Sequence, residues 1–207
     1  MAILRKIVEE QRDQVFIWQD MLLGDKKALE LIMNGYMDML YNYGMRFCTD
    51  TNLIEDCIQD LFIGIWQRRD YLSTSVSIKP YLFSSLRRLV IRKVKISRKA
   101  AFTAFNDDTN EFHFEFSIEK KIMEFEETRA VAQKIKLLVD GLPKRQKEII
   151  YLKFFENLNR DEIAEIMQIS PQAVSNLLQK ALGSLRSNND ILPLLMLMLI
   201  CTGALKA

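Results

Sequence analysis

Histidine and cysteine are scarce in this chain of 207 residues, which has one histidine, His113, and three cysteines, Cys48, Cys57 and Cys201. A zinc site or a disulfide framework needs these residues in sets at characteristic spacings, and three dispersed thiols with one imidazole supply no such set. The sequence therefore predicts no metal, no other cofactor and reduced thiols. The N-terminus also lacks a basic and apolar leader, and both features indicate a cytoplasmic protein.

Glycine and proline are few as well, at seven and four residues, while 49% of the chain is hydrophobic. This composition favours an all-α fold, and the length suffices for two small helical domains with cores of their own. The net charge of +2 indicates no particular partner, but the charge is unevenly distributed. Residues 79–99 hold eight basic residues and no acid, whereas residues 107–127 hold eight acids and two lysines.

Residues 159–186 have the pattern of two helices joined by a tight turn. Asn159 can cap the first helix, with Glu162 reaching back as in a capping box. Ser170 can cap the second helix, and Pro171 suits its first position because a missing N–H costs nothing there. The turn between the two helices is expected at residues 168–169.

The second of these helices is expected to have one apolar stripe and one polar face. Apolar residues recur at positions 174, 177, 178, 181, 182 and 185, as on a helix with one buried side. In a DNA major groove, Asn and Gln on the other side can pair with adenine, and Lys can reach guanine or phosphate. Helical hairpins that serve only in packing share this pattern, so the helix alone leaves both interpretations open. The candidate DNA-reading residues are Ser170, Gln172, Ser175, Asn176, Gln179 and Lys180.

The remaining periodic segments predict helices over residues 3–23, 28–47, 54–66, from 79 onward and 144–155. Eight cations without an acid along the helix from residue 79 repel one another, and a nucleic acid would relieve that repulsion better than solvent alone. The expected organisation is an N-terminal helix (1–23), a first domain (24–99), an acidic and aromatic linker (100–128), a second domain (129–188) and an apolar tail (189–207).

Four segments in one order carry the most specific pattern: IEDCIQDLFIGIW (54–66), SIKPYLFSSLRRLVIRKV (77–94), GLPKRQKEIIYLKFFE (141–156) and the two-helix segment 159–186. Over residues 24–186 they resemble a bacterial sigma-70 family factor of the extracytoplasmic-function (ECF) type. The YLFSSL version of the second segment resembles factors common in Bacteroidetes. The resemblance implies a non-enzymatic subunit that binds core RNA polymerase through the β′ clamp and the β flap, and directs it to promoter DNA.

By the same resemblance, one helix face would dock on the β′ clamp, and the basic helix would lie along the melted minus-10 strand. The linker would thread toward the polymerase active centre, and an anti-sigma factor, in some cases membrane-bound, would be a further partner. The polymerase-binding candidates are Glu55, Asp56, Gln59, Asp60 and Gln67. The minus-10 candidates are Lys79, Arg87, Arg88, Arg92 and Lys93.

Two positions depart from the family's pattern. The family commonly has Asn where Arg88 stands, which favours a phosphate contact over a base contact there. In the second helix of the two-helix segment, Ala173 stands where the family often has Thr, and Leu177 where it often has a polar or basic residue. The cations of this helix are Lys180 and Arg186. Weak DNA binding by this helix, or a factor that relies on another recruiter, is therefore expected.

Two other functions remain open from the residues. The chain could be a helix-turn-helix regulator that does not engage polymerase, or an enzyme that uses its second domain for targeting. The acidic and basic helices of the first domain argue against a plain regulator. Asp56 and Asp60 have the i, i+4 spacing of possible metal ligands, but no His or second carboxylate cluster accompanies them to support an enzyme.

The apolar tail, residues 191–205, is too short to cross a bilayer. Fifteen helical residues reach roughly 22 Å, against a bilayer core of about 30 Å. We expect a terminal helix that packs on one of the domains. The alternatives are a segment that binds an inhibitor or a membrane surface.

Overall fold

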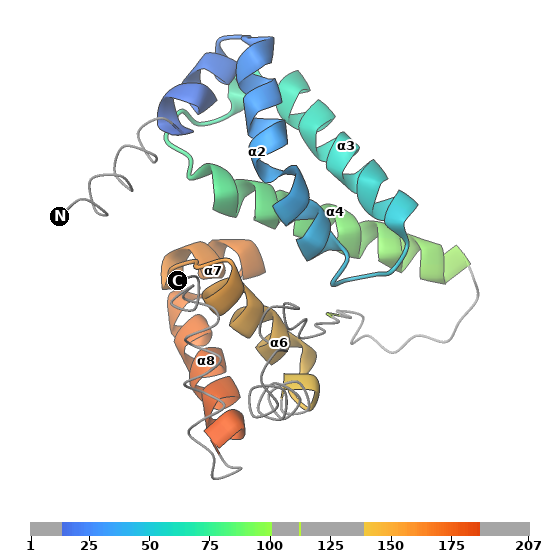
Figure 1. The fold of residues 1–207 in the computed structure, drawn as a ribbon, viewed down its shortest axis with the longest axis vertical. Helices are drawn as coiled ribbons and strands as arrows, with labels where there is room; N and C mark the ends of the chain where they lie inside the picture. The colour runs from blue at the N-terminus through green and yellow to red at the C-terminus, as the bar shows by residue number, and fades with distance from the viewer. Residues whose placement is uncertain (1–13, 101–111, 113–138, 187–207) are drawn as a thin grey trace, which may run out of the picture. The chain divides into compact units, whose positions relative to one another are not determined.

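The computed structural model of the chain describes residues 14–100, 112 and 139–186. The chain divides into two compact units, Met1–Thr109 and Asn110–Ala207. Within the described residues both units are built of helices, without a strand, so the all-α prediction is confirmed (Figure 1). The apolar tail and all of the predicted linker except Phe112 lie outside the described residues.

The N-terminal unit is built on three helices that pack pairwise: α2 (Lys26–Gly44), α3 (Thr51–Gln67) and α4 (Ile78–Ala100). Asp25 caps α2 by accepting a hydrogen bond from Lys27 N at 2.8 Å, and Asp50 caps α3 by accepting one from Leu53 N at 3.1 Å. Each helix turns its apolar stripe inward, as the periodicity predicts. The fully buried side chains include Leu40, Tyr43, Ile54, Ile58, Leu82, Phe83 and Leu86.

The segment that precedes α2 is helical over residues 14–22, within the helix expected at 3–23. Trp18 is fully buried and donates a hydrogen bond from Nε1 to the carbonyl oxygen of Ser73 at 2.9 Å. Its ring also meets that of Tyr81 edge-on, with the centroids 5.5 Å apart. The segment therefore ties the loop before α4 to the core. Val15, by contrast, is 44% exposed.

The C-terminal unit contains α6 (Lys144–Ile150), η3 (Tyr151–Phe155), α7 (Arg160–Met167) and α8 (Pro171–Arg186). The sequence predicts one helix over residues 144–155, but the structure changes at Tyr151 into the wider π-helical turn η3. There the Glu156 N–H donates to the carbonyl of Tyr151, five residues back, at 3.2 Å. The Tyr151 hydroxyl donates to Glu156 Oε1 at 2.7 Å, a buried bond that closes the same turn.

Phe112 belongs to the core of the C-terminal unit. Its side chain is 1% exposed, and its ring centroid lies 5.8 Å from that of Tyr151. Tyr151 in turn stacks on Phe155, with centroids 5.7 Å apart. The predicted linker, residues 100–128, therefore contains at least one residue that acts as an anchor for the domain that follows.

Two glycines of α2 allow a matched stability test. A Cβ at Gly44 would lie 2.7 Å from Cγ2 of the buried Ile54, whereas a Cβ at Gly35 would meet nothing within 4 Å. We expect Gly44→Ala to lower the free energy of unfolding by about 1–3 kcal/mol through overpacking. Gly35→Ala should raise it by about 0.5–1 kcal/mol, because alanine loses less backbone entropy.

Urea unfolding followed by tryptophan fluorescence measures this difference, because both tryptophans, Trp18 and Trp66, lie in the N-terminal unit. Effects of equal sign in the two variants would contradict the close approach of α2 to Ile54.

Candidate nucleic-acid interfaces

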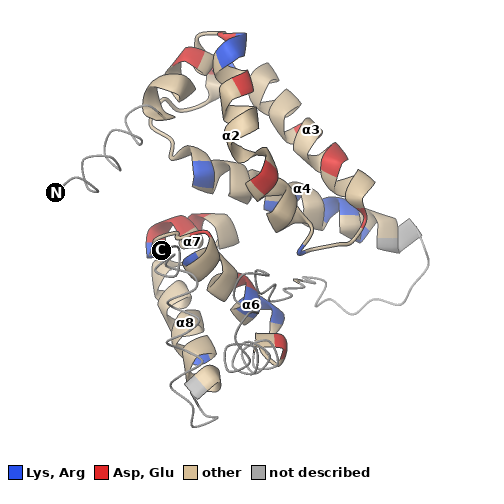
Figure 2. Cartoon of the chain, viewed as in Figure 1, with Lys and Arg blue, Asp and Glu red and all other residues tan. Residues whose placement is uncertain are grey.

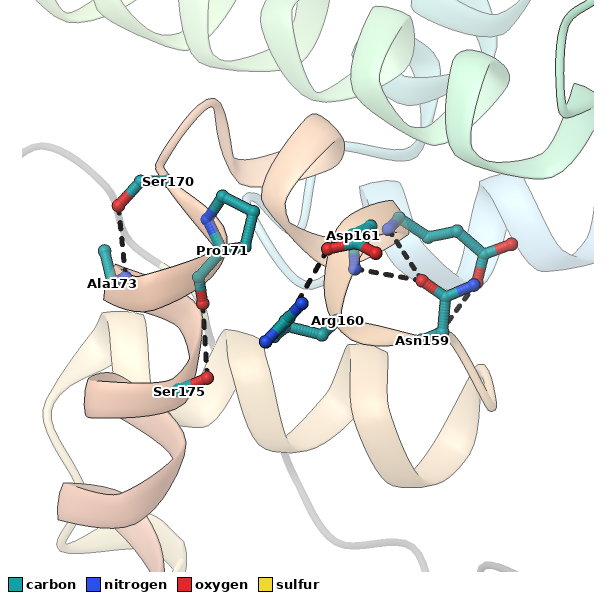
Figure 3. Close-up of polar contacts among 8 residues, drawn as sticks. Asn159, Arg160, Asp161, Ser170, Pro171, Ala173 and Ser175 are labelled. Carbon is teal, nitrogen blue, oxygen red and sulfur yellow. Dashed lines mark hydrogen bonds and ion pairs between the residues drawn. The ribbon is translucent and has the colours of Figure 1, made fainter.

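The first helix of the helix-turn-helix, α7, begins with the capping box that the sequence predicts. Asn159 Oδ1 accepts hydrogen bonds from Asp161 N at 2.9 Å and Glu162 N at 3.0 Å (Figure 3). Glu162 Oε2 accepts one from Asn159 N at 2.7 Å. Three backbone donors at the helix start are thereby satisfied, which fixes where α7 begins.

The turn and the start of α8 are also fixed by local hydrogen bonds. Gln168 ends α7 in the left-handed region at φ 54°, and the N–H of Ile169 donates to the Ala164 carbonyl at 3.1 Å. Ser170 Oγ accepts from Ala173 N at 3.2 Å, and Pro171 is the first residue of α8 (Figure 3). Both cap predictions are confirmed.

Helix α8 presents the polar face that the sequence predicts. Val174, Ala181 and Leu185 are buried, whereas Gln172, Asn176, Gln179 and Lys180 are exposed, as is Ser170 at the cap. Ser175 is half-buried, and its hydroxyl donates to the Pro171 carbonyl at 3.3 Å. Gln172 Nε2 donates to Asn176 Oδ1 at 3.2 Å, so these two amides stand side by side on the surface. The face is rich in donors and acceptors, and Lys180 is the cation among these six residues.

Helix α3 carries the predicted polymerase-binding residues on one side. Glu55, Asp56, Gln59, Asp60 and Gln67 are all exposed, while the apolar residues of α3 fill the core on the other side. Ile63 lies among them and is 55% exposed. The result is a surface that combines carboxylates, amides and one large apolar side chain. Its carboxylates would repel a polyanion such as a nucleic acid.

Helix α4 carries the predicted minus-10 residues, but not all of them reach the surface. Arg88 and Arg92 are exposed, and Lys79 and Lys93 are half-buried. Arg87 is buried, with 7% of the residue exposed, so the prediction that it contacts minus-10 DNA does not fit its position. Position 87 follows the buried Phe83 by one helical turn and precedes the buried Val90 by three residues, so it falls within the inward stripe. The side chains of Arg98 and Lys99 are not described.

An ion pair links α3 to α4. Lys93 Nζ lies 2.7 Å from Asp60 Oδ2, which brings together one residue from each of the two predicted binding surfaces. The hydrogen bond to the Asp60 carboxylate raises the pKa of Lys93 above its ordinary value. Cys57 is buried on the adjacent turn of α3, and burial raises the pKa of its thiol to about 11, which keeps the thiol protonated and unreactive.

Beside this ion pair, the two helices border an open groove of about 640 Å³. Ile63 and Gln67 of α3 line one wall, and Arg88 and Arg92 of α4 line the other. Sequence reasoning missed both features. Asp60 and Lys93 are 33 residues apart, and no local pattern reports which turns of two different helices meet.

Within residues 14–100 and 139–186, no group of three His, Cys, Asp or Glu side chains could hold a metal ion. In the same described part of the chain, no helix is both long and apolar enough to span a bilayer.

Two sigma-70 families match the two units. "Sigma-70 region 2" matches residues 32–100, which contain α3, α4 and most of α2, and "Sigma-70, region 4" matches residues 132–185, which contain the helix-turn-helix. Together they span more than half of the chain. It belongs to the sigma-70 family. The protein is therefore an RNA polymerase sigma factor that acts in transcription initiation.

Three curated relatives are similar to this chain, and two of them are sigma factors by name. The ECF RNA polymerase sigma factor SigM of Bacillus subtilis is 23% identical over 77% of this chain and 94% of its own length. Bacteriocin UviA of Clostridium perfringens is 25% identical over 80% of this chain and 92% of its own length. RNA polymerase sigma factor SigF of Mycobacterium tuberculosis is 41% identical, but over only 24% of this chain and 19% of its own. The SigM match, with the two regions, supports the ECF type.

Two solved structures share the fold of this sigma factor. CnrH, solved in complex with the cytosolic domain of CnrY, covers 86% of the chain with a TM-score of 0.57 and 16% identity, over 97% of its own chain. RpoE of Bartonella quintana, solved with the anti-sigma factor NepR, covers 78% with a TM-score of 0.53 and 18% identity, over 94% of its own chain.

The capping box at Asn159 makes the helix-turn-helix testable. Asn159→Ala removes the acceptor for two backbone N–H groups, and we expect it to lower the free energy of unfolding of the C-terminal unit by about 1 kcal/mol. Asn159→Ser is the control, because serine is an equally good cap and should restore most of that loss. Thermal unfolding followed by helical circular dichroism checks both variants. An alanine variant as stable as the serine variant would refute a stabilising role for the box.

Proposed function

We propose that the exposed side of α3 binds the β′ clamp of core RNA polymerase. The observation that carries this proposal is the separation of the two sides of α3. Every one of its five candidate residues is exposed, although the buried residues between them are strongly apolar. These side chains thus reach solvent, where a partner can contact them. Ile63, at 55% exposure, adds apolar area at the centre of the same surface, where protein interfaces gain most of their binding energy.

We further propose that α4 and the loop before it engage the minus-10 element. Arg88 and Arg92 are exposed on one strip and can contact successive phosphates of a single strand, with Lys79 and Lys93 beside them. Arg87 is excluded from this strip because it is buried. The loop at residues 72–77 is held at Ser73 by Trp18, which gives it a fixed start from which to capture an unstacked base. Arg88 provides a phosphate contact rather than a base contact.

For the minus-35 element, we propose that α8 lies in the major groove. The exposed amides of Gln172, Asn176 and Gln179 are suited to adenine, and Ser170, Ser175 and Lys180 complete the contact surface. Because this surface has so few cations, it should bind DNA weakly by itself. That observation favours a factor that depends on polymerase contacts such as the β flap, or on another recruiter, to hold α8 on DNA.

The partners then follow from the family. Core polymerase and promoter DNA are the expected ones, and an anti-sigma factor is proposed because one structural neighbour, RpoE, was solved with the anti-sigma factor NepR. A sigma subunit needs no catalytic residues of its own, so the protein is proposed to be non-enzymatic. It would work where polymerase and promoters lie, in the bacterial cytoplasm. The likeness of residues 81–86 to Bacteroidetes factors stays a prediction.

Reconstitution with core polymerase tests the function directly. We expect the full chain to bind core and to support transcription from members of a promoter library. Changing both Asp56 and Asp60 to Lys should weaken core binding about tenfold or more. In the proposed interface these two acids face basic groups of the clamp, and the two lysines would repel those groups. Asp38→Lys is the control, since it changes an exposed acid on α2 instead. Core binding that is equal in the double variant and the control would place the polymerase contact elsewhere.

The low charge of α8 gives a second test. In an anisotropy titration at physiological salt, the full chain without polymerase should bind a duplex that contains its minus-35 element no more tightly than about 10⁻⁶ M, the range of non-specific binding. Adding a cation by Gln179→Lys should tighten binding and steepen its salt dependence by about one unit. Nanomolar binding by the unmodified chain would contradict this account of α8.

A further inference from the structure

The Asp60–Lys93 ion pair joins the surface proposed for polymerase to the surface proposed for DNA. The two charged atoms are 2.7 Å apart, and both side chains still reach solvent, with 53% of Asp60 and 29% of Lys93 exposed. Asp60 is therefore accessible to polymerase, and Lys93 to DNA, while the two side chains are still paired with each other. While the pair is intact, neither charge is fully available outside the molecule.

The surroundings of the pair make this competition specific. The adjoining groove between α3 and α4 includes Asp60 as its one acid and three arginines, Arg68, Arg88 and Arg92. Arg88 donates to Ser85 Oγ at 3.0 Å, and Arg68 donates from Nε to the Gly64 carbonyl at 3.1 Å. These bonds hold the two arginines on their own helices. Asp60 itself pairs across the two helices with Lys93 of α4.

We propose that this ion pair couples polymerase binding to DNA binding through an exchange of partners. A basic group of polymerase that engages Asp60 releases the Lys93 ammonium to a DNA phosphate, and a phosphate that engages Lys93 releases the Asp60 carboxylate to polymerase. Because coupling between two binding events is reciprocal, each partner strengthens the other by the same factor. The inference rests on the proposed function, since it assigns the two charges to those two partners.

The size of the effect follows from the exposure of the pair. Ion pairs that remain partly open to water correspond to about two- to five-fold in an equilibrium constant. The pKa of Lys93 is raised by the hydrogen bond to Asp60, so the ammonium stays charged throughout the working pH range. The exchange is therefore a change of partner and not a loss of a proton.

A double-mutant cycle tests the DNA side of the exchange. The variants are Asp60→Asn, Lys93→Gln and their combination, with Asp56→Asn as the matched control that removes one carboxylate from the same side of α3. Anisotropy at low salt measures binding of a labelled single-stranded oligonucleotide of mixed sequence to the full chain. Asp60→Asn should tighten binding about two- to five-fold beyond Asp56→Asn, and this extra gain should vanish when Lys93 is Gln.

The polymerase side gives an independent measurement on the same variants. Lys93→Gln should tighten binding to core polymerase by a similar factor, because it frees Asp60, and it should have no such effect when Asp60 is Asn. A pair that only holds α3 to α4 would lower the melting temperature in both single variants without tightening either interaction. The two gains in affinity therefore separate coupling from simple structural support.

The outcomes distinguish this inference from the proposed function. If Asp60→Asn and Asp56→Asn act alike on the oligonucleotide, or if Lys93→Gln leaves core binding unchanged or weaker, the coupling is refuted while the sigma-factor assignment stands. If the unmodified chain does not bind core polymerase at all, the proposed function is refuted, and the polymerase half of the coupling is refuted with it.

Discussion

Helix α3 packs on α4 within the N-terminal unit. The exposed side of α3 carries acidic residues, and the exposed side of α4 carries basic residues. The buried residues of α3 are apolar, and Figure 2 shows acidic residues on α3 and basic residues along α4. An acidic strip that suits a protein and a basic strip that suits a polyanion therefore lie within a side chain's reach of each other. Asp60 and Lys93 form an ion pair between the two. The same packing that builds the core thus brings the two proposed binding surfaces into contact.

The C-terminal unit depends on a different kind of constraint, because its geometry comes from hydrogen bonds near in sequence. The capping box at Asn159, the left-handed Gln168 and the cap at Ser170 fix both ends of the turn within a dozen residues. Few charges are needed to hold this arrangement, and few are present on the exposed side of α8. The shape of this unit is thus well determined, and the scarcity of cations on α8 is the basis of the proposal that other contacts in the complex hold α8 on a promoter.

Features that depend on residues close together in the sequence could be predicted, whereas features that depend on contacts between distant segments could not. Periodicity locates α2, α3, α4 and α8, and short-range chemistry locates the caps of the helix-turn-helix, because both depend on residues a few positions apart. Burial of Arg87 depends on where α4 meets its neighbours, and counting charges cannot show it. The contact between Phe112 and Tyr151, at the start of the π-helical turn, joins residues that are far apart in the sequence. The groove and the Asp60–Lys93 pair depend on the register between two helices, which no single segment encodes.

The low charge of α8 and the Asp60–Lys93 ion pair would both lower the affinity of the free protein for DNA. A genome offers about 10⁶–10⁹ non-specific sites, so a sigma factor that bound DNA strongly by itself would be distributed among them. On α8, the scarcity of cations limits counterion release, and on α4 the contact with Asp60 occupies one of the cations that would otherwise add to it. Both effects would lower the affinity of the free chain for DNA without weakening the folded units. In the proposed complex, polymerase bound to α3 would supply the binding energy that the free chain lacks, so that DNA contact would follow assembly.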